Sequence, residues 1–560
     1  MNKTEFLLKI EKDLKKWRES HQAEIEEAEK DERFTEDGIP LNLLYTPLDI
    51  EGDYSKDIGF PGDYPYTRGI EATGYRNNLW TLSQYAGFGN AKETNILFKN
   101  MIEHGNSPYL ALDLPTQQGY DPDDSKALGE VGRTGTTVKS LRDWETIFDG
   151  ISMRDLYIGT VANAQASVIL AMHLISAEKQ GADLKLVRGS LQNDILKEFT
   201  ARGNYIFPVE PSLRLVTDVI EFCSEKLPAF WPICVCGSHF PEAGANRIHE
   251  VAFSMGNAFT YIDQLIEREI PIDRFVKGFF FLMKTNHFDL FEEVAKFRAM
   301  RKIWATTLKE KYGATDPESL KLKILGHSGG SLLTRERPEL NIARTTLACL
   351  VGALGGIQLI GIRTMDEVFG IPTEKSEMIA IGSQHVVAHE TGIPDVVDPL
   401  GGSYYTEALT KTFEKCIYDE LDRIDQMGGM IRALETGYIK RTITEDAYKS
   451  HKQFESGKKI KVGANKYRIE EGEAPRRPYK LDPQEESRQI AELNELKRDR
   501  DNALVDKTLN RLRQIAQQPA GSENNLVPPI VEAVRVYATM GEICGVLREV
   551  FGEHQEPNVL

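Results

Sequence analysis

The sequence predicts an α/β fold: a TIM (β/α)8 barrel followed by a C-terminal helical region. Eight short apolar runs alternate with longer helix-like segments between about residues 80 and 365. Intervals of roughly 25 to 50 residues suit a strand, a crossover helix and two loops, and eight such units can close into a barrel. The alternation stops after about residue 405. We therefore expect an N-terminal helix and extended arm over 1–60, the barrel over 61–404, and a helical region with a charged connection over 405–560.

Each predicted element has its own pattern. An amphipathic helix opens the chain, because four large apolar residues recur there at helical spacing: Phe6, Ile10, Leu14 and Trp17. The predicted strands are LSQYAG at 82, YLALDL at 109, LYIGTVA at 156, LVRGSL at 186, ICVCG at 233, GFFFLM at 278, LKLKILG at 320 and IQLIGI at 357. Beyond residue 405 the sequence predicts helices, a charged connection that contains Pro, and two final helices around 484–517 and 525–551.

Composition narrows the class of protein. The chain has 560 residues with 68 Lys and Arg against 85 Asp and Glu, a formal net charge of −17, and 41% of its residues are hydrophobic. This balance favours a soluble globular protein and argues against disorder or a nucleic-acid partner. The N-terminus has no signal-peptide pattern and no later window resembles a membrane span, so we expect a cytoplasmic chain with no membrane partner.

The six cysteines predict reduced thiols rather than a disulfide framework. They are scattered through apolar or helical segments: Cys223, Cys234, Cys236, Cys349, Cys416 and Cys544. Cys234 and Cys236 precede His239, but no second ligand pair follows at zinc spacing. We therefore expect core packing there and no metal site.

Polar residues gather where the predicted strands end. They are Tyr85 after the first strand, Asp113 and Gln117 after the second, Gln192 after the fourth, His239 after the fifth and His327 after the seventh. The carboxyl ends of barrel strands form the catalytic face of TIM-barrel enzymes. This placement predicts a functional site at that end.

Residues 326–330 read GHSGG and offer an alternative, since they fit the nucleophile elbow of serine hydrolases. An elbow needs a helix directly after the serine, yet Pro338 and several charges follow within about two turns. A triad also needs an acid and then a histidine later in the chain. Asp366 with His385 or His389 has that order, but such a combination is easily found by chance. The hydrolase interpretation is therefore the remote one.

Several long strings resemble the large catalytic chain of the methylmalonyl-CoA mutase family, over roughly residues 40–555. They are TRGIEATGYRNNLWTLSQYAGFGNAKETN, ALDLPTQQGYDPDD, GEVGRTG, QNDILKEFTARGNYIFP, GSHFPEAGA and VDPLGGSYY. The resemblance implies an isomerase that uses adenosylcobalamin to rearrange the carbon skeleton of an acyl-coenzyme A thioester by radical chemistry. It also implies a barrel followed by helices.

The resemblance assigns roles to individual residues. Tyr85 matches the aromatic residue between corrin and substrate, and Arg202 the arginine that binds a substrate carboxylate. His239 and Gln192 match residues beside the thioester carbonyl. Further substrate contacts are implied at Thr73, Thr81, Lys323 and Gln358. Corrin-facing positions are implied at Leu112, Thr134, Ala201, Glu242, Gly330, Glu367 and Gly370.

Other positions depart from the family pattern. Asn78, Ser83 and Gly278 stand where arginines meet the coenzyme A phosphates, and Lys323 replaces a further arginine; Arg68, Arg76 or Lys277 could substitute from nearby. The channel for the pantetheine arm is more apolar at Tyr109, Gly159, Val161, Phe280 and Ile360. Ser238 and Gly74 replace larger residues near the acyl group. We therefore expect a bulkier carboxylated malonyl- or succinyl-type substrate, or an acyl carrier other than free coenzyme A.

The sequence contains no D-x-H-x-x-G motif, the motif whose histidine ligates cobalt in the family. We therefore expect a separate small cobalamin-binding subunit and a hetero-oligomer, as in two-chain members. The alternative is a non-catalytic structural subunit of a mutase heterodimer. Retention of Tyr85, Arg202, Gln192 and His239 together favours the catalytic interpretation.

Overall fold

The structure is a computed structural model that describes residues 3–30, 32, 34–35, 37–50, 58–103, 107–370, 372–469 and 482–556. At its centre lies a parallel sheet of nine strands in the order β5-β4-β3-β2-β1-β9-β8-β7-β6. The strands are β1 (Thr81–Ala86), β2 (Ser107–Leu110), β3 (Ile158–Thr160), β4 (Gly189–Leu191), β5 (Phe230–Trp231), β6 (Ile233–Cys236), β7 (Phe279–Thr285), β8 (Lys323–Ser328) and β9 (Leu359–Gly361). All eight predicted apolar runs contribute to this sheet.

The sheet closes into a barrel at Pro232. β5 pairs with β4 and β6 pairs with β7, so the two ends of the strand order are consecutive in the chain and separated by Pro232 alone. Proline has no N–H to donate and interrupts the ladder. Beyond it, the Cys234 N–H donates to the Gln192 carbonyl just past β4, at 2.9 Å. Residues 230–236 are thus a single strand that Pro232 interrupts. The sheet is a closed barrel of eight strands, which confirms the prediction.

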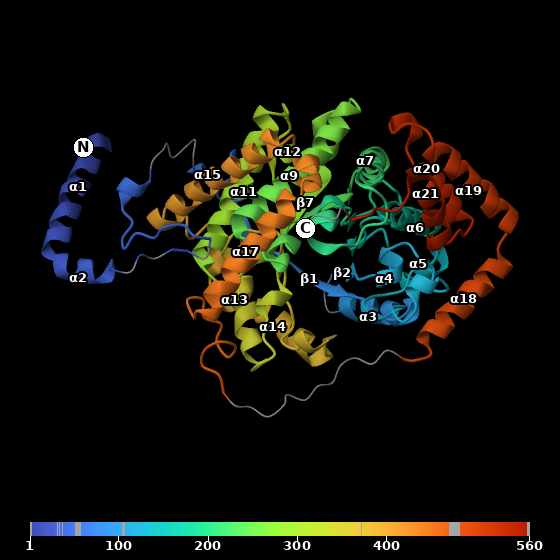
Figure 1. The fold of residues 1–560 in the computed structure, drawn as a ribbon, viewed down its shortest axis with the longest axis horizontal. Helices are drawn as coiled ribbons and strands as arrows, with labels where there is room; N and C mark the ends of the chain where they lie inside the picture. Colours follow the sequence, from blue (N-terminus) through green and yellow to red (C-terminus); the bar gives the residue numbers. More distant parts are fainter. Residues whose placement is uncertain are drawn as a thin grey trace.

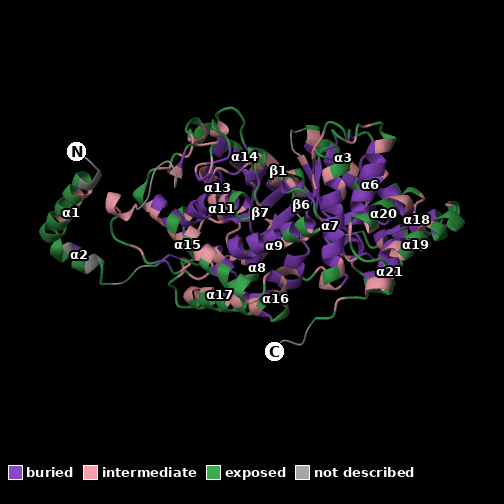
Figure 2. Ribbon diagram, turned by 90° about the horizontal axis from the view of Figure 1, so that it is seen from above, coloured by how far each residue is buried: buried purple, intermediate pink, exposed green. Residues whose placement is uncertain are grey.

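Crossover helices surround the barrel (Figure 1). The longest are α3 (Ala91–Glu103), α6 (Ala166–Lys179), α7 (Val209–Lys226), α9 (Arg247–Glu267), α11 (Leu290–Glu310), α13 (Leu340–Leu354) and α14 (Glu374–Glu390). α6 is buried along residues 166–177, unlike an ordinary surface helix. Its outer side is covered by α20 (Val527–Arg535), which explains why its sequence is apolar all round. Figure 2 shows the buried residues concentrated in the strands and in the helices that touch them.

The C-terminal residues form α15 (Tyr404–Gln426), α16 (Met430–Glu435), α17 (Tyr438–Glu455), α18 (Glu485–Asp499), α19 (Asn502–Ala516), α20 and α21 (Met540–Phe551). The prediction of two helices around 484–517 and 525–551 is wrong, because each range contains two. Asp501 caps α19 by accepting the Leu504 N–H at 3.0 Å, and Thr539 forms a capping box with Glu542 at α21. Local side-chain caps therefore end one helix and begin the next.

The predicted N-terminal helix is α1 (Lys3–Ser20), followed by α2 (Gln22–Ala28). Both lie apart from the barrel at one end of the molecule (Figure 1), and Phe6 and Leu8 are exposed. Within the described ranges, no helix combines the length and apolar composition that crossing a membrane requires.

Candidate active site

Gln192, Arg202 and His239 come together at the carboxyl end of the barrel. Gln192 directly follows β4, and Arg202 ends a short π-helix (Glu198–Arg202) that leads away from it. The π-helix stops at Gly203, whose φ of 89° is a left-handed conformation that suits glycine. His239 begins α8 (His239–Ala243), three residues past the end of β6.

A hydrogen-bond network links Arg202 to Gln192 through two buried side chains. Arg202 donates from Nη2 to Gln117 Oε1 at 2.7 Å and from Nη1 to Glu198 Oε1 at 3.2 Å. Lys197 donates to the same Glu198 oxygen at 2.6 Å and to Gln192 Oε1 at 2.5 Å. Lys197 and Glu198 are almost fully buried, whereas the Arg202 side chain is 22% exposed. The guanidinium is thus held in place while part of it remains accessible.

The same network continues to His239. Gln192 Nε2 donates to Cys236 Sγ at 3.4 Å, and Cys236 Sγ lies 3.0 Å from His239 Nδ1. Burial, followed by the positive charges of Lys197 and Arg202, lowers the pKa of His239 well below its ordinary value. The imidazole is therefore neutral, so it has one N–H to donate and one bare nitrogen.

Sequence analysis singled out Gln117 and Cys236 but not their contacts with Arg202 and His239, and it missed Lys197 and Glu198. The signal for the last two was present in QNDILKEFTARG, where a Lys–Glu pair follows Ile195 and Leu196 and precedes the arginine. Buried charges such as Lys197 and Glu198 need partners, and the functional residues nearest to them in the chain are Gln192 and Arg202. For Cys236 the sequence predicted only core packing, although the residue stands three positions before His239.

Two predicted site residues lie within strands rather than after them. Tyr85 belongs to β1, where its backbone is level with Tyr109 of β2, and His327 belongs to β8. Tyr85 already lies inside the predicted run LSQYAG, whereas β8 extends two residues beyond the predicted run LKLKILG and so includes His327. The Tyr85 side chain lies outside the described residues. Burial, then the charge of Arg363, lowers the pKa of His327 well below its ordinary value.

Most of the predicted corrin-facing positions also lie at this end. Thr134, Gly330 and Gly370 are exposed, and Ala201 and Glu367 are partly buried. Glu367 pairs with Arg363. Leu112 differs, because its side chain is completely buried in the core. These residues follow the carboxyl ends of β2, β4, β6, β8 and β9, and all but Leu112 are at least partly accessible on that face of the barrel.

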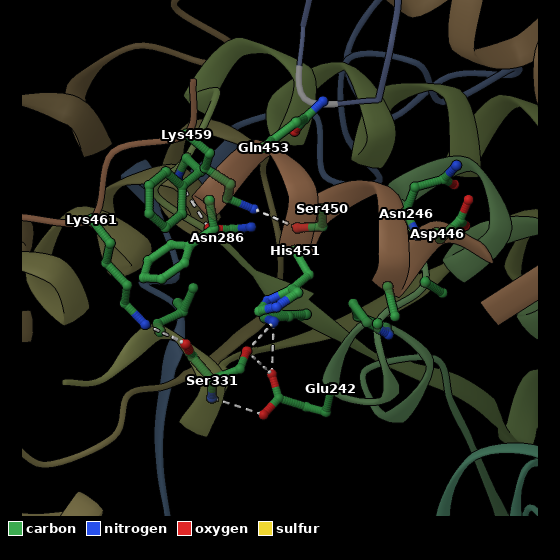
Figure 3. A pocket seen from close by; sticks show the side chains of 18 of the residues that line it. Glu242, Asn246, Asn286, Ser331, Asp446, Ser450, His451, Gln453, Lys459 and Lys461 are labelled. Atoms are coloured by element: carbon green, nitrogen blue, oxygen red, sulfur yellow. Dashed lines mark hydrogen bonds and ion pairs between the residues drawn. The ribbon is translucent and has the colours of Figure 1, made fainter. Parts of the chain in front are cut away.

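Glu242 is the best-anchored member of that face. Its carboxylate pairs with Lys284 Nζ at 2.7 Å and accepts the Ser331 N–H at 3.0 Å and the Ser331 hydroxyl at 2.7 Å (Figure 3). Burial disfavours the charged carboxylate, but Lys284 and Ser331 outweigh it and lower the pKa of Glu242. A Cβ at Gly329 would lie 2.0 Å from Glu242 Oε1, whereas one at Gly330 would meet only Oε2, at 3.7 Å. Gly329 is therefore buried against the Glu242 carboxylate, whereas Gly330 is exposed beside it.

A cavity of about 780 Å³ extends from Glu242 beneath α17. Many polar and charged residues line it beside apolar ones, and Figure 3 labels Glu242, Asn246, Asn286, Ser331, Asp446, Ser450, His451, Gln453, Lys459 and Lys461. Lys461 donates to the carbonyl of Ser331 at 2.7 Å, which ties the segment after α17 to the loop after β8. The cavity is large enough for part of a cofactor or substrate.

The remaining predicted substrate residues lie at the opposite end of the barrel. Thr81 and Lys323 begin β1 and β8, Gln358 directly precedes β9, and Thr73 precedes the 3-10 turn Gly74–Arg76. A smaller cavity of about 220 Å³ is lined there by residues that include Asn78, Thr81 and Gln358. The two groups of predicted residues are thus separated by the length of the strands.

The possible substitutes for the missing phosphate-binding arginines differ in availability. Arg68 Nε pairs with Asp398 at 3.0 Å, and Lys277 pairs with Asp316. Arg76 is exposed, and no ion pair is found for it within the described part of the chain. Arg76 is therefore the most available of the three.

Aromatic side chains narrow the barrel interior between the two ends. A Cβ at Gly159 would lie 2.2 Å from the Tyr109 ring, so only glycine leaves room for that ring. Phe280 packs with Cys234 and Leu325, and its ring lies 5.2 Å from that of Trp231. These contacts agree with the predicted apolar character of the interior.

The GHSGG segment does not form a nucleophile elbow. Ser328 is the last residue of β8, is fully buried, and accepts the Arg363 N–H at 2.8 Å. A 3-10 turn (Gly330–Leu332) follows it instead of a helix. The serine is therefore a structural hydrogen-bond acceptor, which removes the basis for the hydrolase interpretation.

Comparison with known proteins agrees with this geometry. The family model described as methylmalonyl-CoA mutase matches residues 34–553. The chain is 37% identical over 535 residues to the 2-hydroxyisobutanoyl-CoA mutase large subunit of Aquincola tertiaricarbonis, which covers 95% of this chain and 94% of that protein. It is 36% identical to the methylmalonyl-CoA mutase of Escherichia coli (strain K12) and 34% identical to the mitochondrial methylmalonyl-CoA mutase of Homo sapiens. These matches cover 94% and 93% of this chain, and 72% and 69% of those proteins. The chain belongs to the methylmalonyl-CoA mutase family.

Proposed function

We propose that the chain is the large subunit of an adenosylcobalamin-dependent acyl-CoA mutase that rearranges the carbon skeleton of a carboxylated acyl thioester. The observation that carries the proposal is the single hydrogen-bond network that joins Arg202, Gln192 and His239 at the carboxyl end of the barrel. This end is where TIM-barrel enzymes hold their reacting groups.

Arg202 binds the free carboxylate of the substrate. A guanidinium can pair with a carboxylate through two parallel hydrogen bonds, which fixes direction as well as charge. Glu198 and Gln117 hold Arg202 in place before substrate arrives, so little side-chain freedom is lost on binding. A malonyl- or succinyl-type acyl group has the required carboxylate.

His239 and Gln192 act at the thioester carbonyl. A neutral imidazole can donate a hydrogen bond to the carbonyl oxygen and stabilise negative charge that develops there. The buried surroundings strengthen that bond by excluding water. Tyr85 of β1 is proposed to lie between substrate and cofactor, as its counterpart does in the family.

Adenosylcobalamin, when bound, supplies the radical chemistry that starts the rearrangement. The exposed face described above would fit a corrin, because Gly330 presents no side chain there and Glu242 is a fixed acceptor for amide groups. We assign the cofactor to Thr134, Ala201, Glu242, Gly330, Glu367 and Gly370, with Leu112 supporting the face from the core. The polar cavity beside Glu242 provides further room.

Coenzyme A, or another acyl carrier, is proposed to enter from the amino end of the barrel, past Thr73, Thr81, Lys323 and Gln358. The narrow aromatic interior and the altered phosphate contacts support a substrate other than methylmalonyl-CoA. Residues 61–404 would bind substrate, with 1–60 as an arm and 405–560 as a helical region. The relative named as a large subunit supports a small cobalamin-binding partner that supplies the cobalt ligand.

The test is reconstitution with such a small subunit and adenosylcobalamin, followed by assay of substituted malonyl- and succinyl-CoA thioesters beside isobutyryl-CoA, which has no carboxylate. Turnover of a carboxylated thioester is expected. Arg202→Gln should lower kcat/KM by about 10³-fold, because it leaves a buried carboxylate unpaired. The matched control is Arg154→Gln, an arginine that is 67% exposed and far along the chain from the site.

Two results would count against the proposal. Unchanged activity of Arg202→Gln would remove the carboxylate-binding role. A complex with the small subunit that retains no cobalamin on titration would favour the structural-subunit alternative.

A further inference from the structure

Cys236 lies between the two side chains that the proposed function places at the thioester carbonyl. It is the last residue of β6, and its side chain is fully buried. Its sulfur lies 3.0 Å from His239 Nδ1 and 3.4 Å from Gln192 Nε2. We infer that Cys236 is a positioning residue whose thiol donates to His239 Nδ1, so that the imidazole carries its hydrogen on Nε2. The catalytic consequence rests on the proposed function, whereas the tautomer is a property of the chain alone.

The direction of hydrogen bonding is set at Lys197. An ammonium group has hydrogens but no acceptor, so the Gln192 atom 2.5 Å from Lys197 Nζ must be the amide oxygen. Asn163 Nδ2 donates to the same oxygen at 2.9 Å. The opposite amide orientation would place NH2 against two donors. The Gln192 NH2 group therefore faces Cys236, and the sulfur receives a hydrogen from it.

The sulfur keeps its own hydrogen, which must then point elsewhere. Burial raises the pKa of Cys236 to about 11, so the thiol is protonated at neutral pH. Two acceptors are near it: His239 Nδ1 at 3.0 Å and Ser238 Oγ at 3.6 Å. His239 is uncharged, and a neutral imidazole has one bare nitrogen. The shorter contact is the one that an S–H donor and a bare Nδ1 would make.

This arrangement decides which ring nitrogen of His239 can act. The tautomer of a histidine is set by the hydrogen bond that its other nitrogen makes. With Nδ1 occupied by the thiol, Nε2–H is available to donate to a carbonyl oxygen. The opposite tautomer would present a bare nitrogen, which cannot stabilise developing negative charge. Each side chain thus donates to the next: Lys197 to Gln192, Gln192 to Cys236, and Cys236 to His239.

Nuclear magnetic resonance of the chain labelled with ¹⁵N-histidine tests the tautomer directly. His239→Gln identifies the His239 resonances by their disappearance. Wild-type His239 is expected to be protonated on Nε2 near neutral pH. Cys236→Ser, which retains a hydroxyl donor, should keep that tautomer, whereas Cys236→Ala should give a mixture. Cys223→Ala controls for removal of a buried thiol elsewhere, on α7.

Kinetics of the reconstituted holoenzyme tests the catalytic consequence. Because rate follows the fraction of the competent tautomer, Cys236→Ala should lower kcat by about three- to tenfold with KM unchanged, and Cys236→Ser should restore most of it. A wild-type His239 protonated on Nδ1, or an unchanged tautomer in Cys236→Ala, would overturn the inference. A tautomer shift without a change in kcat would overturn the positioning role. Inactivity of every holoenzyme, Cys223→Ala included, would instead count against the proposed function. The wild-type spectrum reports the tautomer of His239 without a Cys236 variant, so it tests the inference even if Cys236→Ala does not fold.

Discussion

Arg202 donates a 2.7 Å hydrogen bond to Gln117, which joins the π-helix after β4 to the last residue of α4 (Leu114–Gln117) after β2. The Gln117 amide is itself locked, because its Oε1 also accepts from Asn204 at 3.0 Å and its Nε2 donates to the Leu112 carbonyl at 2.6 Å. Two short helical segments that are far apart in the sequence therefore hold the Arg202 guanidinium in place.

Replacing Gln117 should weaken substrate binding more than catalysis. Gln117→Leu removes the acceptor that orients Arg202, and a hydrogen bond to a charged group is worth about 1.5–3 kcal/mol. KM for the carboxylated substrate is expected to rise by about tenfold or more, with a smaller change in kcat. The measurement is steady-state kinetics of the holoenzyme. Gln118→Leu, one residue along, is the control. Equal effects of both substitutions would show that Gln117 acts only through the local fold.

The C-terminal tail supports the same π-helix. The His554 ring lies edge-on to Tyr205 at 4.5 Å and to Phe199 at 4.7 Å, and its backbone N–H donates to the Ile206 carbonyl at 3.1 Å. Tyr205 also donates to Glu556 at 2.7 Å. Phe199 is part of the π-helix that ends at Arg202, so the tail packs directly on the element that presents the guanidinium.

Removing the His554 ring should therefore loosen Arg202. Each aromatic contact is worth about 0.5–1.5 kcal/mol, so His554→Ala is expected to raise KM by about two- to fivefold and to speed hydrogen exchange over 198–206. His389→Ala, at an exposed histidine on α14, should change neither quantity. Faster exchange without any change in KM would show that the tail stabilises the π-helix but does not affect substrate binding by Arg202.

The sequence was sufficient for the barrel because apolar runs record which strands are buried on both faces. The sequence pattern was insufficient where a single side chain decides where a strand or helix begins or ends. Pro232 divides one strand, and Asp501 and Thr539 each start a new helix inside a range that the sequence predicts as one helix. In the site, resemblance named Arg202 and His239 as single residues. The bond between Arg202 and Gln117 joins residues 85 positions apart, and the spacing of residues does not encode such a contact.

Gly329 should be intolerant of a side chain. A Cβ there would lie 2.0 Å from Glu242 Oε1 and 2.7 Å from Lys284 Cε, so Gly329→Ala forces the ends of both side chains of this ion pair to move. We expect a lower melting temperature and at least tenfold weaker cobalamin retention in the complex with the small subunit, since overpacking costs about 1–3 kcal/mol. Gly382→Ala on α14, where a Cβ meets nothing within 4 Å, should be neutral or slightly stabilising. Normal cofactor retention by Gly329→Ala would argue that Glu242 does not face the corrin.

His173 should make the fold sensitive to mild acid. It lies on α6 with only 2% of its surface exposed, and its ring centroid is 5.3 Å from that of Phe230 and 6.0 Å from that of Trp144. Its buried Nε2 has no hydrogen-bond partner among the residues that the structure describes. Burial lowers the pKa of His173 from 6.5 to about 4. The unfolded chain therefore binds a proton at this residue below about pH 6.5, while the folded chain stays unprotonated there until about pH 4.

Because the unfolded state binds more protons in that window, the stability of the fold falls as the pH is lowered through it. The loss from His173 is about 2 kcal/mol by pH 5 and about 3 kcal/mol once the pH is below both pKa values. His173→Phe removes the titrating group and keeps a ring between the same neighbours. The melting temperature of the wild type should therefore fall more between pH 7 and pH 5 than that of His173→Phe, by a few degrees. His389→Phe, at an exposed site, should behave like the wild type. Parallel melting curves for wild type and His173→Phe across this range would show that protonation of His173 does not contribute to acid lability.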